Sequence, residues 1–237
     1  RAAEVTVDAK NLVQVSQLLA RVAPGPWSAA LVTRAAALSP ASLKVSMRAT
    51  SATARPASTE AAEVLVLNSL EVAGDLNGTK VRVRSGRDQN NQTSNEMGAS
   101  GSLKLEAEKP SVLLRQLGLQ AITLSGVGKG LLEASWRPAS NGNRRAANKV
   151  LQPVVDLKAQ IAGTAFSFSG TAASLLPQPD LRGRLAVTSK NAAPLLQLLA
   201  FVLPNAGANT PLDVSGDFAW RGDRLSAGSI QGHLFGS

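Results

Sequence analysis

Apolar and polar residues alternate in short runs along most of the chain. Near its start, Val5 and Val7 alternate with Glu4, Thr6 and Asp8. Because successive side chains of a β-strand point to opposite faces, a period of two predicts a strand with one buried and one solvated face. Comparable runs recur at 43–47, 64–67, 81–83, 103–105, 122–124, 166–168, 185–187, 212–214 and 218–220. The pattern predicts a mainly β protein with short helices, in the α+β class.

A helical spacing follows the first predicted strand. The apolar residues of segment 12–22 recur at intervals of three and four, which places them on one side of a helix. Asn11 can cap the start of this helix, and the Pro-Gly-Pro sequence at 24–26 ends it. Segment 28–38 is rich in alanine and indicates a further helix.

The order of a strand followed by a helix recurs twice more. Residues 103–105 precede a predicted helix over 110–117 that Gly118 ends. Residues 185–187 precede a predicted helix over 191–203 that a proline ends. The chain therefore contains three strand-helix units.

A second sequence pattern, called the spacing marker below, recurs with the same spacing in all three units. Two apolar residues four apart lie on the same face of a strand, and the glycine that follows them marks a turn or bulge into the next strand. The three copies are Val72-x-x-x-Leu76-x-Gly78-Thr79, Leu157-x-x-x-Ile161-x-Gly163-Thr164 and Ile230-x-x-x-Leu234-x-Gly236-Ser237. We expect a single elongated region built of units at about 1–85, 101–175 and 181–237, with polar loops at 48–62, 86–101, 138–149 and 204–211.

The composition removes many kinds of active site. The 237 residues include no Cys, one His and 3% aromatic residues, and 44% are hydrophobic, which is enough for a core. Thiol catalysis, disulfides and thiolate or multi-histidine metal sites are excluded, and a Ser/His/acid triad would have to use His233. We expect no enzyme, no catalytic residues, no cofactor and no metal.

The charge is strongly basic. Lys and Arg number 25 against 16 Asp and Glu, a formal net charge of +9 that suits an anionic membrane or nucleic acid. Nucleic acid is not expected, because aromatic residues for base stacking are few. One predicted strand carries a basic row that could meet lipid headgroups or an anionic leaflet: Lys80, Arg82, Arg84 and Arg87. The alternative is an edge strand protected by positive charge.

The last unit carries the most specific pattern. It contains Leu181-Arg-Gly-Arg-Leu-Ala-Val-Thr-Ser-Lys-Asn, an apolar segment, Leu212-Asp-Val-Ser-Gly-Asp, Gly222-Asp-Arg-Leu225 and Ile230-Gln-Gly-His-Leu-Phe-Gly-Ser237. In order and spacing, residues 181–237 resemble the repeats of the AsmA family of bacterial envelope proteins, and the two earlier units resemble them more loosely.

The resemblance implies a periplasmic protein that supports outer-membrane biogenesis. Its repeated strands would form a curved antiparallel sheet or groove, capped by amphipathic helices, that shields or guides phospholipid. The resemblance also implies an inner-membrane anchor, an N-terminal helix outside this sequence, and we expect the chain to be a soluble fragment of a longer protein. The family offers no catalytic residues to carry over.

A lipid carrier must cover acyl chains with apolar strand faces. The candidates for such a groove are Val72, Leu76, Val81, Val83, Leu157, Ile161, Phe166, Phe168, Ile230, Leu234, Leu199 and Phe201. The alternative for each strand residue is an ordinary core packed under helices. Leu199 and Phe201 belong to the apolar helix expected before Pro204, which either caps the sheet or forms a lip for a lipid tail.

Two other functions remain open at this level. One is a structural or assembly component of the cell envelope with envelope protein partners and a closed core, broadly similar to the type II secretion protein N in its strand repeats. The other is a hydrolase that uses His233.

Overall fold

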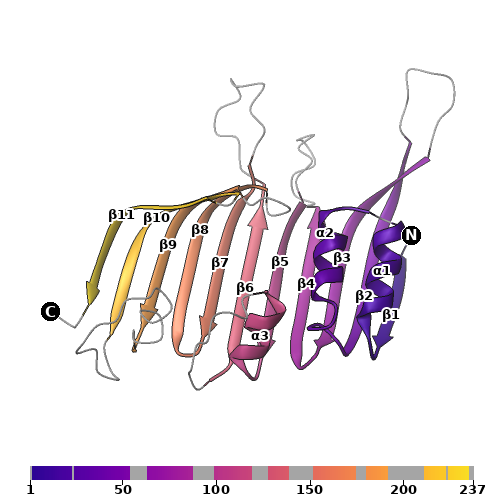
Figure 1. Cartoon of the computed structure of the whole chain (residues 1–237). Coiled ribbons are helices and arrows are strands. Elements are labelled where there is room, and N and C mark those ends of the chain that lie inside the picture. The colour runs from indigo at the N-terminus through magenta and orange to yellow at the C-terminus, as the bar shows by residue number, and fades with distance from the viewer. Residues whose placement is uncertain are drawn as a thin grey trace.

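The chain folds into one open antiparallel sheet of eleven strands whose spatial order is their order in the sequence (Figure 1). The computed structural model describes residues 2–22, 24–53, 63–87, 99–118, 128–138, 152–174, 180–191, 211–222 and 224–234. The strands are β1 (Ala2–Ala9), β2 (Ala41–Thr53), β3 (Glu63–Leu76), β4 (Thr79–Arg87), β5 (Ala99–Ala107), β6 (Gly130–Arg137), β7 (Val154–Ile161), β8 (Thr164–Ser174), β9 (Asp180–Ser189), β10 (Leu212–Arg221) and β11 (Arg224–Leu234). The prediction of a mainly β, antiparallel fold is confirmed.

Helices interrupt this meander after the first strand of each of the first two units. Helices α1 (Leu12–Val22) and α2 (Pro26–Arg34) connect β1 to β2, and α3 (Pro110–Gln116) connects β5 to β6. The backbone N–H of Val13 donates to Asn11 Oδ1 at 2.9 Å, so Asn11 caps α1 as expected. The predicted third helix lies outside the described residues, apart from Asn191.

The spacing marker of the first two units encodes tight hairpins. Asn77 and Gly78 connect β3 to β4 with φ values of 50° and 80°, and Ala162 and Gly163 connect β7 to β8 with φ values of 51° and 81°. Two consecutive residues with positive φ form the kind of two-residue turn that matches the twist of a β-hairpin. The third copy ends at 235–237, outside the described residues.

The strand register separates apolar and charged residues onto two faces. Val5 pairs with Val45, Val45 with Val72, and the same row continues through Val83 and Leu103. The apolar face, as we call it, carries Val5, Val7, Leu43, Val45, Leu70, Val72, Leu76, Val81, Val83, Leu103, Leu105, Leu132, Trp136, Val155, Leu157, Ile161, Phe166, Phe168, Leu185, Val187, Val214 and Phe218. The charged face carries Glu4, Lys44, Arg48, Glu71, Asp75, Lys80, Arg82, Arg84, Lys104, Glu106, Glu133, Asp156, Lys158, Arg182, Arg184, Asp213 and Asp217.

The three helices of the described residues lie on the apolar side of the sheet, and the core is under them (Figure 1). Leu12 of α1 and Ala35, just after α2, are buried with Ala41 at the start of β2. Leu113 and Leu114 of α3 are buried against a second group on β5, β6 and β7: Ala107, Leu132, Ala159 and Ile161. Both groups reach the strand ends next to the helical connections and the two tight hairpins.

Two predictions about connections need correction. The predicted loop 48–62 begins too early, because β2 continues to Thr53 after a register shift at Arg48/Ala49 and β3 begins at Glu63. The predicted loop 86–101 is also too long, since β4 reaches Arg87 and β5 begins at Ala99. In both cases small and polar residues form the ladder bonds of a strand, which need no apolar side chain.

The sheet also bends at its last hairpin. The upper parts of β10 and β11 turn over the top edge of the sheet in Figure 1. The register of this pair shifts between Ser215 and Asp217, and Ser229 on β11 has a φ of 50°. A β-bulge of this kind adds an unpaired residue and increases local twist, which accounts for the bend.

Candidate functional site

The structure brings the predicted groove residues together on the apolar face. Eight of them are members of that face in the central strands: Val72, Leu76, Val81, Val83, Leu157, Ile161, Phe166 and Phe168. Leu234 pairs with Leu212, and Ile230 shares its face by alternation. Leu199 and Phe201 lie outside the described residues.

Part of this face is closed by the helices. Leu76 packs against the cluster under α1 and α2, and Ile161 belongs to the cluster under α3. Leu157 and Phe166 pack against the α3 cluster, and Val81 and Phe168 are buried. For Leu76 and Ile161 the geometry is that of an ordinary helix-covered core.

Other residues of the apolar face are only half-buried. We call four of those that lie in neither helix-covered cluster the open part: Val83, Trp136, Leu185 and Phe218. They come from β4, β6, β9 and β10, and the buried Val155 and Phe168 lie on β7 and β8 between them.

Glycines make room for aromatic rings in this region. Phe218 and Phe168 meet edge to face with ring centroids 6.1 Å apart, and Gly183 on β9 lies opposite Phe218. The Trp136 ring lies so close to Gly101 that a Cβ built there would overlap the ring and the Arg84 carbonyl. The alternation at 218–220 predicted the strand that carries Phe218, but neither Phe218 nor Trp136 was among the predicted groove residues. Trp136 extends the alternation of Leu132 by two more steps.

Three of the four residues of the basic row lie on the opposite face of the sheet. Lys80, Arg82 and Arg84 are exposed there, and the side chain of Arg87 is not among those described. Strand β4 pairs with both β3 and β5, so the alternative of a charge-protected edge strand is wrong. The sheet therefore separates these cations from an acyl chain on the apolar face.

Acidic residues on neighbouring strands accompany these cations. Arg84 Nε lies 3.0 Å from Glu71 Oε1, Lys44 Nζ 2.8 Å from Glu4 Oε1, and Lys104 Nζ 2.9 Å from Glu133 Oε1. All of these side chains are well exposed, so each pair contributes between 0 and about 1 kcal/mol. The pattern is typical of a solvated face whose cross-strand neighbours have opposite charges.

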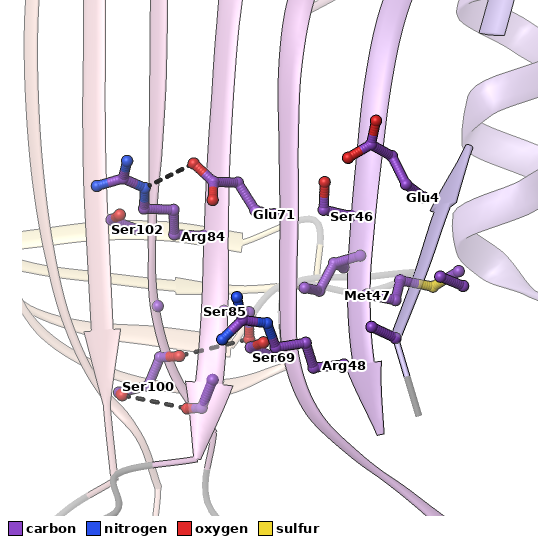
Figure 2. A pocket seen from close by; sticks show the side chains of 15 residues that line it. Glu4, Ser46, Met47, Arg48, Ser69, Glu71, Arg84, Ser85, Ser100 and Ser102 are labelled. Carbon is purple, nitrogen blue, oxygen red and sulfur yellow. Dashed lines mark hydrogen bonds and ion pairs between the residues drawn. The ribbon is translucent and has the colours of Figure 1, made fainter. Parts of the chain in front are cut away.

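A shallow hollow of about 740 Å³ lies on β1–β5, around residues 2–4, 46–48, 69–71, 84–86 and 100–102 (Figure 2). Arg48, Arg84, Glu4 and Glu71 line it together with Met47, Leu70 and small residues. Arg84 and Glu4 already have ion-pair partners, and Ser100 Oγ donates to the Gly86 carbonyl at 3.3 Å. Because its charged residues are exposed and several already have partners within the protein, the hollow resembles ordinary solvated surface.

One exposed cluster has shifted pKa values. Lys129 Nζ lies 2.9 Å from Glu108 Oε1 and 3.6 Å from Glu106 Oε1. The hydrogen bond and the positive charge of Lys129 lower the pKa of Glu108, and Glu108 in turn raises the pKa of Lys129. Both side chains stand in solvent before β6, which is the situation of a surface ion pair.

Other chemistry is sparse in the described part of the chain. His233 is exposed on β11 opposite Asp213, and the described residues hold no group of three or more His, Asp or Glu side chains that could ligate a metal. Within the same residues, no helix is long and apolar enough to cross a bilayer. No protein-family model, curated protein or solved structure matches the chain.

Proposed function

We propose that this chain is a non-catalytic, AsmA-like periplasmic module whose apolar face shields or guides phospholipid acyl chains, in support of outer-membrane biogenesis. The observation that carries the proposal is the continuity of the apolar face across the sheet, of which the helices of the described residues cover only a part. The sequence resemblance of residues 181–237 supports the family and the compartment in this proposal.

The dimensions and energetics of the apolar face support an acyl ligand. Eleven strands spaced about 4.8 Å apart give the sheet a width of about 48 Å. The acyl region of one leaflet is about 15 Å thick, so the sheet is wide enough to cover the length of an acyl chain. Each methylene removed from water contributes about 0.8 kcal/mol, so an exposed chain of about 16 carbons costs on the order of 10 kcal/mol. Half-buried apolar residues on several strands supply a surface that offsets this cost.

The open part is where a tail would lie. Val83, Trp136, Leu185 and Phe218 are half-buried, whereas Leu76 and Ile161 would have to lose their helix contacts before they could meet a ligand. Substitutions that test the proposal therefore belong in the open part, because changes at Leu76 or Ile161 would also destabilise the fold.

Uptake of a fluorescent fatty acid by delipidated protein tests this function. We expect saturable binding, and the double variant Val83→Ser/Leu185→Ser should bind about tenfold more weakly. The matched control is Val154→Ser/Leu131→Ser, because Val154 and Leu131 are half-buried in strands but alternate onto the charged face. Absence of saturable uptake by the unchanged protein, or an equal loss in the control, would contradict the proposal.

A second candidate is an assembly module of the cell envelope with a closed core. The observation in its favour is that β1 and β11 each pair with only one strand among the described residues, so each offers an unpaired backbone edge. Recovery of a stoichiometric envelope protein with this chain, free of lipid by mass spectrometry, would favour this candidate over lipid shielding.

A further inference from the structure

Large exposed apolar side chains gather at the two ends of the sheet. Of the eight in the described residues, four belong to β1 and α1: Val5, Leu18, Leu19 and Val22. Three belong to β10 and β11, namely Trp220, Leu225 and Ile230, and Leu67 is on β3. Leu18 and Val22 are 61% and 76% exposed, although apolar side chains on an amphipathic helix ordinarily face the core.

The side of helix α1 that packs on the sheet is not the side that carries Leu18 and Val22. Its buried residues are Leu12 and Ser16, and the Leu12 N–H donates to Ser39 Oγ at 2.9 Å. At about 100° per residue, Leu18 and Val22 lie together on the helix surface, away from the direction of Leu12 and Ser16. The apolar sector of α1 is therefore wider than the sheet can cover, and the surplus faces solvent.

The surroundings of this patch are basic. The helical segment 10–38 contains no Asp or Glu and three Lys or Arg, which are Lys10, Arg21 and Arg34. Lys10 precedes α1 and Arg21 lies in its last turn, both exposed, while the remaining polar residues of α1 are Gln14, Ser16 and Gln17. The nearest acidic residues, Glu4 and Asp8, belong to β1, where their contacts are Lys44 and Ser42 on β2.

We infer that α1 docks on the surface of an anionic bilayer, with Leu18, Leu19 and Val22 in the boundary between headgroups and acyl chains and with Lys10 and Arg21 at the phosphates. An apolar stripe beside cations and without acidic residues is the combination that interfacial helices use. Lys80, Arg82 and Arg84 take no part, because they lie on the far face of the sheet. This docking does not depend on an acyl chain occupying the apolar face.

Flotation with lipid vesicles tests the docking. The unchanged protein should float with vesicles of phosphatidylcholine and phosphatidylglycerol at three to one, and much less with phosphatidylcholine alone. Leu18→Ser/Val22→Ser should bind the anionic vesicles at least about tenfold more weakly, since it removes most of the buried apolar area. Arg21→Gln and Lys10→Gln should each cost about fivefold, and added salt should weaken binding in the same direction.

The matched control lies at the other end of the molecule. Leu225→Ser alters a side chain that is 65% exposed on β11 and is not among the groove candidates, and it should leave vesicle binding unchanged. Equal binding by the Leu18→Ser/Val22→Ser variant, equal loss in the control, or no preference for anionic vesicles would each overturn the inference. A failure of the unchanged protein to float would also overturn it, and would favour a protein partner for the apolar patch on α1.

The fatty-acid assay separates this inference from the proposed function. The Leu18→Ser/Val22→Ser variant should keep its uptake of a soluble fatty acid while it loses vesicle binding. Normal vesicle binding without fatty-acid uptake would contradict lipid shielding and leave the docking of α1 in place.

Discussion

Two threonines in equivalent positions have different hydrogen-bonding environments. Thr79 and Thr164 each follow the glycine of a tight hairpin, and both are almost completely buried. Thr164 Oγ1 lies 3.0 Å from Ser189 Oγ, its cross-strand neighbour. Thr79 faces Ala107 instead, and its Oγ1 has no hydrogen-bond partner in the described structure. A buried hydroxyl without a partner costs about 1–3 kcal/mol.

The same isosteric substitution should therefore have opposite effects at the two sites. Thr79→Val removes an unpaired hydroxyl, and we expect the free energy of unfolding to stay constant or to rise by about 1 kcal/mol. Thr164→Val removes a paired hydroxyl and should lower that free energy by about 1 kcal/mol. Urea unfolding followed by circular dichroism measures both. Equal losses in the two variants would show that Thr79 Oγ1 is satisfied in solution.

The exposed pair Glu108–Lys129 gives a prediction about pH. Because Lys129 lowers the pKa of Glu108, this carboxylate should keep its charge to a lower pH than an ordinary glutamate. The contribution of the pair to stability is then present above the pKa of the unfolded carboxyl group and disappears as the pH falls through the folded value. The carboxyl carbon shift in an NMR titration gives the midpoint, which Lys129→Met should move upward. An unchanged midpoint in that variant would assign the shift to another cause.

At the scale of elements, the two tight hairpins differ in one residue of their turns. The first uses Asn77-Gly78 and the second Ala162-Gly163, although Asn77 and Ala162 have φ values of 50° and 51°. A left-handed backbone costs most L residues about 1–2 kcal/mol, and asparagine tolerates it better than alanine. Ala162→Asn should therefore raise the free energy of unfolding by about 0.5–1 kcal/mol in a denaturant titration. A decrease would mean that the contact of Ala162 with the α3 cluster outweighs the backbone preference.

The elements themselves were largely predictable, because their signals are local. Alternation at 5–7 and 103–105 predicted strands, the spacing within 12–22 predicted α1, and the glycines at 78 and 163 predicted a turn or bulge into the next strand. The place of a strand in the sheet is not a local property. The basic row on β4 has the composition of an edge, yet β4 has partners on both sides, and its cations lie beside Glu71 and other acids on neighbouring strands.

At the scale of the whole molecule, the register between strands decides whether the apolar sides of separate strands lie on one face of the sheet. Sequence patterns predicted that Val83, Leu157 and Phe168 would each face one way, but no single strand could show that all the units join in one sheet with their apolar sides in common. The sequence also could not predict which part of that face the helices cover. This depends on which strands α3 packs against after it leaves β5. Leu76 and Ile161 were candidates for the groove on sequence grounds, and the structure packs both under helices.

An open sheet with helices over part of one face should have uneven local stability. Strands β6 and β7 have partners on both sides and lie next to the α3 cluster. Strand β11 has one partner among the described strands, a register shift and exposed side chains from Arg224 to His233. Local opening free energies range from near zero at frayed edges to the global value in the core. Amide hydrogens of β6 and β7 should therefore exchange only through global unfolding, and those of β11 orders of magnitude faster. Hydrogen exchange with mass spectrometry resolves this gradient, and β11 amides as protected as those of β7 would mean that another strand covers the β11 edge in solution.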